Sequence, residues 1–156
     1  MPENEFMQRA IALALENVRS NRGGPFGALI VKNGKIIVEA ANCVTSTNDP
    51  TAHAEIVAIR EACKILGAFQ LTGCEIYASC EPCPMCLAAI YWARINRIYF
   101  AGTAADATQA GFDDSFIYQE IAKPRDRRKI PMLQLMHQES LAPLRAWAQK
   151  PGKVSY

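Results

Sequence analysis

The sequence has little net charge, only two histidines and no long apolar run. A formal charge of +2 argues against a strong nucleic-acid-binding surface, because such surfaces gather many unbalanced basic residues. No apolar stretch is long enough to cross a bilayer, and the N-terminus carries acids where a secretory signal carries basic residues. We therefore expect a cytoplasmic protein without a membrane segment.

Basic residues are massed only between Lys123 and Lys129, where Asp126 interrupts the run. We interpret this cluster as the solvated face of a loop. The rest of the composition, 50% hydrophobic and 21% charged residues, is that of an ordinary globular protein. A chain of 156 residues can bury a sizeable core, and we expect residues 1–156 to form a single domain.

Periodicity and turn residues predict an α/β fold. Asn33-Gly34, the pair that two-residue hairpin turns prefer, joins two β-rich runs at 28–32 and 35–39. Further strands are predicted at 75–79, 97–101 and 132–136. Helices are predicted at 6–19, 82–93, 112–121 and 141–149. One more helix is predicted to begin at a cap, Asp49 or Thr51, and to end at Leu66. This order indicates a mixed five-stranded sheet with helices on both faces.

A split motif supplies candidate metal ligands and a candidate base. His53 and Glu55 stand near the start of one predicted helix, and Cys83 and Cys86 lie in the first turn of another. Histidine and cysteine are common zinc ligands, and three protein ligands leave the fourth position open, as in catalytic sites. Glu55 is the candidate general acid and base. The motif therefore predicts a zinc enzyme.

Cys80 provides the main alternative to a catalytic site. It precedes Cys83 and Cys86 at the same spacing, and a fourth ligand would close the site into a structural zinc module. Pro82 is expected to turn Cys80 away from the helix face, which favours the open site. Trp92, beside the site helix, and Phe26, after a Gly-Gly-Pro turn, are candidate aromatic contacts for a planar substrate.

The combination of His-x-Glu with Pro-Cys-x-x-Cys resembles the signature of zinc nucleobase deaminases. The chain resembles the cytidine-deaminase-like superfamily, and within it the bacterial guanine deaminases. Four segments carry this likeness over essentially the whole chain: 24–28, 48–55, 80–86 and 110–116.

The resemblance implies a three-layer α/β/α fold and hydrolytic conversion of guanine to xanthine and ammonia. It implies zinc held by His53, Cys83 and Cys86, with Glu55 moving protons. The resemblance also implies that Asp114 is a second catalytic carboxylate and that the Asn42 amide hydrogen-bonds the purine. It implies that the Phe26 ring stacks on the purine and that Tyr156, the C-terminal residue, closes the pocket. It also implies a homodimer that exchanges C-terminal segments.

Other functions stay open at this point. A tRNA adenosine deaminase would share the zinc motif, but the near-neutral charge disfavours a polyanionic substrate. A deaminase of another base, a nucleoside or an aminotriazine is a closer alternative, because substrate choice depends on a few pocket side chains. The alternative outside enzymes is the closed structural zinc module.

Overall fold

The computed structural model describes residues 2–156, which fall into two compact units separated after Ser115. The first unit contains α1 (Pro2–Arg19), β1 (Gly27–Lys32), β2 (Lys35–Ala41), α2 (Val44–Thr47), α3 (Ala54–Leu66), β3 (Cys74–Cys80), α4 (Pro84–Trp92), β4 (Arg97–Gly102) and α5 (Ala104–Gln109). The second contains most of α6 (Asp114–Ala122), a short 3₁₀ turn (Arg125–Arg127) and α7 (Leu141–Gln149). None of the helices in the described residues could span a membrane.

The sheet of the first unit has four strands in the order β2-β1-β3-β4. β1 pairs antiparallel with β2 and β3, whereas β3 and β4 are parallel. The hairpin between β1 and β2 turns at Asn33 and Gly34, with φ of 51° and 70°. These left-handed values suit asparagine and glycine and confirm the predicted turn.

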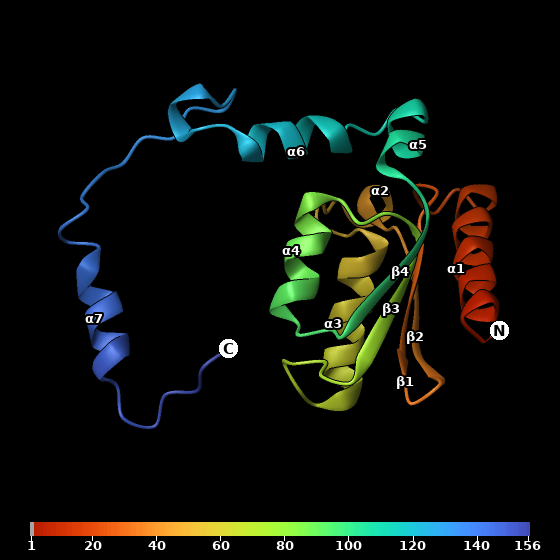
Figure 1. Ribbon diagram of the computed structural model, residues 1–156, viewed down its shortest axis with the longest axis horizontal. Helices are drawn as coiled ribbons and strands as arrows, with labels where there is room; N and C mark the ends of the chain where they lie inside the picture. The colour runs from red at the N-terminus through yellow and green to blue at the C-terminus, as the bar shows by residue number, and fades with distance from the viewer. Residues whose placement is uncertain (1) are drawn as a thin grey trace. The chain divides into compact units, whose positions relative to one another are not determined.

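Helices cover both faces of this mixed sheet, as predicted (Figure 1). Successive residues of β1 point to opposite faces, so Ala28 and Ile30 join a core with α3, while Leu29 and Val31 pack with Ala10 of α1. All four of these strand residues are at most 1% exposed. The continuous apolar run of β1 is therefore explained by burial on both faces.

The predicted fifth strand at 132–136 is wrong. These residues form no strand in the second unit, and their backbone carries features that oppose an extended ladder. Pro131 lacks a backbone donor, and Met136 adopts a left-handed φ of 50°. The apolar residues suggested a buried strand, but Leu133 and Leu135 are 85% and 81% exposed.

The helix that carries His53 begins later than predicted. His53 itself is its N-cap, while Asp49 accepts hydrogen bonds from the amide and hydroxyl of Thr51 in the preceding turn. The predicted end is confirmed, since Gly67 caps the helix with φ of 61°. A separate short helix, α2, occupies residues that the sequence left unassigned.

Candidate active site

Two helix N-termini present the motif residues. His53 is the N-cap of α3 and Cys83 the N-cap of α4, and both have extended backbone angles that let the side chain leave the helix end. Neither side chain makes the capping hydrogen bond usual at this position. Both are thereby available as ligands. Cys86, one turn further along α4, reaches the same point because residues three apart share a helix face.

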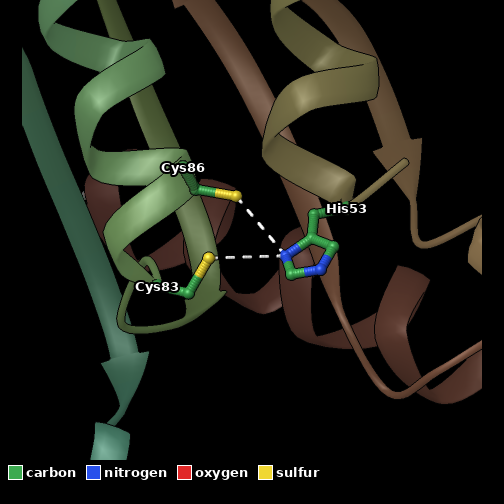
Figure 2. Close-up of side chains that lie close together, drawn as sticks. All are labelled: His53, Cys83 and Cys86. Atoms are coloured by element: carbon green, nitrogen blue, oxygen red, sulfur yellow. Dashed lines mark hydrogen bonds between the residues drawn. The ribbon is translucent and has the colours of Figure 1, made fainter. Parts of the chain in front are cut away.

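The donor atoms of His53, Cys83 and Cys86 converge (Figure 2). His53 Nδ1 lies 3.5 Å from each of the two sulfur atoms, and all three donor atoms lie within 4.8 Å of one another. One imidazole and two thiolates at this separation fit tetrahedral zinc, with one coordination position left open. The chain therefore has a zinc site of the catalytic type.

Cys80 is not part of this cluster, which is the one such group found in residues 2–156. Its sulfur lies 3.5 Å from the carbonyl oxygen of Thr103 instead. Burial raises the pKa of the Cys80 thiol to about 11. The geometry thus agrees with an open three-residue site and not with a closed structural module.

The surroundings of the two cysteines favour a thiolate at Cys83. Its pKa is lowered to about 4, first because Cys86 hydrogen-bonds to the sulfur and also because His53 lies beside it. The same hydrogen bond, together with burial, raises the pKa of Cys86. The pKa of His53 is raised, chiefly by its hydrogen bond with Cys83. A divalent cation would replace the protons shared among these three groups.

Glu55 is a buried carboxyl group beside the ligands. It is 8% exposed, and its Oε2 lies 3.5 Å from Cys86 Sγ. Burial is the main cause that raises the pKa of this carboxyl group. A carboxylate with little water around it holds a proton more strongly, which suits a group that accepts and returns one.

A cavity of about 390 Å³ opens onto this cluster. It is lined by six residues singled out from the sequence: Phe26, Asn42, His53, Glu55, Cys83 and Asp114. The first unit thus brings together residues from widely separated parts of the chain. Cys86 is fully buried and absent from this lining, as expected of a ligand behind the cavity wall.

Asp114 is the first residue of α6 and lines the cavity. Its pKa is raised, mainly by burial and then by the charge of Cys83. The cavity therefore has two carboxyl groups, Glu55 and Asp114, whose proton affinity the protein increases.

The hydrogen-bond network fixes the orientation of the Asn42 amide. Its Oδ1 accepts from the backbone N–H of Gly24 at 3.3 Å and of Val44 at 3.2 Å. Two donors require the oxygen at this position, so the amide NH₂ is the group left to donate. Asn42 therefore offers a hydrogen-bond donor at the cavity.

Sequence reasoning did not single out every lining residue, and Glu81 and Phe112 are among those it missed. Glu81 accepts a hydrogen bond from the Ala104 backbone N–H at 2.8 Å, at the start of α5. Phe112 packs edge-on against Phe26, with ring centroids 4.8 Å apart at an interplanar angle of 78°. Both residues lie within the segments 80–86 and 110–116 that carry the family resemblance, which was a signal, but sequence reasoning assigned neither of them a role.

One predicted substrate contact, Trp92, does not line this cavity. Trp92 ends α4, at the opposite end from Cys83, is 61% exposed and does not line the cavity. Tyr156 belongs to the second unit and is 72% exposed. A closing role for Tyr156 stays a prediction.

Comparison with known proteins defines the class. Residues 1–102 match the family described as the cytidine and deoxycytidylate deaminase zinc-binding region, and the chain belongs to this family. It is 56% identical to guanine deaminase from Bacillus subtilis over 100% of both chains. A crystal structure of guanine deaminase from that organism matches with a TM-score of 0.95 over 98% of each chain.

A second relative resembles a smaller part of the sequence. The tRNA-specific adenosine deaminase of Aquifex aeolicus is 51% identical over 49% of this chain and 51% of its own length. The shared zinc region thus extends to enzymes named for different substrates, whereas the guanine deaminase match spans the entire chain.

Proposed function

We propose that this protein is a zinc-dependent guanine deaminase, converting guanine and water to xanthine and ammonia. The observation that carries the proposal is the cavity that groups His53, Cys83, Glu55, Asp114 and Asn42. The full-length identity of 56% to a guanine deaminase supports this substrate over others. A neutral base also suits a chain of small net charge.

His53, Cys83 and Cys86 would hold the zinc ion. When bound, zinc lowers the pKa of a water molecule, so that the water attacks carbon at neutral pH. Two thiolates and a neutral imidazole leave the site without net charge, which makes the ion a milder Lewis acid than one held by three imidazoles. A buried base is then needed close by, and Glu55 lies 3.5 Å from one ligand sulfur.

Glu55 would move the proton that this attack releases. It accepts the proton of the attacking water as the C2–O bond forms, and returns it to the ring nitrogen next to C2. Asp114 would deliver a proton to the exocyclic amine, the C2–N bond breaks and ammonia leaves, while the hydroxyl at C2 becomes the xanthine carbonyl and returns its proton to Asp114. The elements of water are thereby added and one ammonia is released. Increased proton affinity at both carboxyl groups supports these assignments.

The remaining lining residues would hold the purine. The Asn42 amide would donate to an acceptor on the purine edge, because its oxygen is already occupied by Gly24 and Val44. Phe26 would stack on the ring, with Phe112 supporting it from the side.

The active form would be a homodimer with exchanged C-terminal segments. Each domain would then be completed by the C-terminal segment of the other chain. Large exposed apolar side chains in the second unit, including Ile130, Leu133 and Leu135, support burial against a second copy. Tyr156 would then close the partner's pocket. A cytoplasmic location also stays a prediction, in line with thiolate ligands that need a reducing environment.

The test is release of xanthine and ammonia from guanine by the zinc-loaded protein, with cytosine, adenosine and an aminotriazine in parallel. Turnover of guanine alone is the expected result. Consumption of another base instead would overturn the substrate assignment but keep the zinc chemistry. Activity on tRNA that falls steeply with added salt would favour the adenosine alternative, because turnover of a neutral base depends little on salt.

A further inference from the structure

One buried polar side chain lies outside the cavity and outside the chemistry above. α1 has three buried residues, Ala10, Ala14 and Asn17, and Asn17 alone is polar, at 2% exposure. Burying an amide is unfavourable unless its groups are hydrogen-bonded. Its partners therefore indicate what the side chain is for.

Asn17 joins two segments that reach the cavity. Its Nδ2 donates to the carbonyl oxygens of Gly24 and Asn42, each at 2.9 Å. Two carbonyl acceptors require the NH₂ group at this position. The end of α1 thus holds the turn before β1 and the residue after β2 together, although 25 positions separate Asn17 from Asn42.

The same segments are in close contact with each other. A Cβ at Gly23 would lie 2.1 Å from the Asn42 carbonyl oxygen, so only glycine fits there. The Gly24 N–H donates to Asn42 Oδ1 at 3.3 Å, and the Asn42 N–H donates to the Phe26 carbonyl oxygen at 3.1 Å. The network therefore holds the Asn42 side chain and the backbone of Phe26.

We propose that Asn17 is a positioning residue for purine binding, which acts through Asn42. It fixes the Asn42 carbonyl from one side while Gly24 fixes the side-chain oxygen, and together they direct the amide NH₂ into the cavity. Because Asn17 does not line the cavity, its influence passes through its hydrogen bonds to the Asn42 carbonyl and to the Gly24 carbonyl, and the Gly24 N–H in turn donates to Asn42 Oδ1. The inference rests on the proposed function, since it assigns Asn42 as the purine ligand.

Removing the two donors should weaken purine binding more than catalysis. The Asn17→Ala variant should show a KM for guanine raised about tenfold, which is the effect of losing one neutral hydrogen bond, here the one from the Asn42 amide to the purine. Its kcat should change less than about twofold. A merely structural role would instead reduce the melting temperature and the active fraction, leaving KM unchanged.

Ala14→Gly is the matched control. Ala14 lies on the same buried face of α1 three residues earlier, and glycine there weakens the helix without removing a hydrogen bond of the network. Zinc content is measured for each variant, and the Kd for guanine is measured by calorimetry in a Glu55→Gln background. A KM and Kd for Asn17→Ala equal to those of Ala14→Gly would overturn the proposal.

A double-mutant cycle with Asn42→Ala tests the route of action. If Asn17 acts through Asn42, the double variant binds guanine no more weakly than Asn42→Ala alone. Additive losses would overturn the proposal. Should Asn17→Ala fail to fold, Asn17→Ser keeps one donor and should give a smaller rise in KM, whereas an unchanged KM would contradict the role.

Failure of the proposed function has a separate signature. The wild-type protein would then leave guanine unchanged. The double-mutant cycle of Asn17 and Asn42 is in that case measured with the base that the protein does consume. If no base is consumed, calorimetry of guanine with the zinc-loaded wild type and Asn17→Ala proteins decides, and equal affinities or no binding to either overturn the proposal.

Discussion

The two units of this chain differ in how they treat apolar side chains. In the first unit, Leu29, Ile30 and Ile76 are completely buried on the two faces of one sheet. In residues 116–156 no side chain is buried, and large apolar residues stand exposed along the whole segment: Ile121, Ile130, Met132, Leu133, Leu135, Met136, Leu144, Val154 and Tyr156. The first unit is thus stabilised by its own hydrophobic core, whereas residues 116–156 have no buried core.

This difference indicates that the two units have different roles. The metal ligands lie at the N-termini of α3 and α4, and both helices pack into the buried core of the first unit, as a preorganised site requires. The second unit exposes many large apolar side chains, which the proposed homodimer would bury. Substitutions in the two units should consequently affect different measurements.

The largest effect is expected at the chemistry of the first unit. Glu55→Gln removes the proton-accepting oxygen but keeps the shape of the buried side chain. Deamination should fall by about 10³-fold, within the range that general acid and base groups contribute. Zinc content and the melting temperature are the controls. A variant that kept its zinc and more than a tenth of its activity would contradict the role of Glu55.

Core packing gives the next largest contrast. Ile76→Ala, at 0% exposure, should lower the free energy of unfolding by about 3 kcal/mol through lost burial and a residual cavity. Ile130→Ala, at 78% exposure, should cost less than about 0.5 kcal/mol under conditions that keep the protein monomeric. Urea denaturation at low protein concentration compares the two. Equal losses would show that the second unit has a core of its own.

Association provides a third comparison. Leu133→Asp and Leu135→Asp, at 85% and 81% exposed positions, should leave the first unit folded but weaken dimerisation by about 2 kcal/mol each. Light scattering after gel filtration measures the dimer fraction across concentrations. Gln134→Asp, between the two leucines, adds the same charge without removing an apolar contact. An unchanged dimer in both leucine variants would remove the explanation for this exposed surface.

Prediction from sequence succeeded where local chemistry decides the structure. The Asn33-Gly34 turn and the Gly67 helix end follow from backbone preferences of the residues concerned. The metal cluster follows from the spacing of Cys83 and Cys86 on one helix turn and from the motif around His53. The turn and the helix end need no knowledge of distant contacts, whereas the approach of His53 to Cys83 and Cys86 was predicted from the motif and not from local preferences.

Prediction failed where a distant contact decides. The apolar pattern at 132–136 is compatible with a strand, but a strand also needs a hydrogen-bonded neighbour, which the sequence does not specify. Phe112 lies at the cavity because it packs against Phe26. Glu81 is held there by the hydrogen bond that it accepts from the Ala104 N–H at the start of α5. Asn17 reads as one more polar residue near a helix end, and only its two carbonyl partners distinguish it.

The smallest effect is expected on the surface of the first unit. Arg9 donates to both carboxylate oxygens of Glu39, at 2.9 Å and 2.6 Å, and this hydrogen bonding lowers the pKa of Glu39. Both side chains are more than a third exposed, at 38% and 37%, so the pair should contribute less than about 1 kcal/mol.

The sign of its pH dependence follows from the lowered pKa. Because folded Glu39 binds its proton less tightly than the unfolded chain does, the contribution is complete above the ordinary value of 4.5 and is lost as the pH falls through the folded pKa. Glu39→Gln should therefore be slightly less stable than the wild type at pH 7, and the difference should vanish in acid. Glu61→Gln, which removes the exposed pairing with Lys64, is the control. A difference that stayed constant from neutral to acid pH would mean that side-chain packing, and not charge, joins α1 to β2.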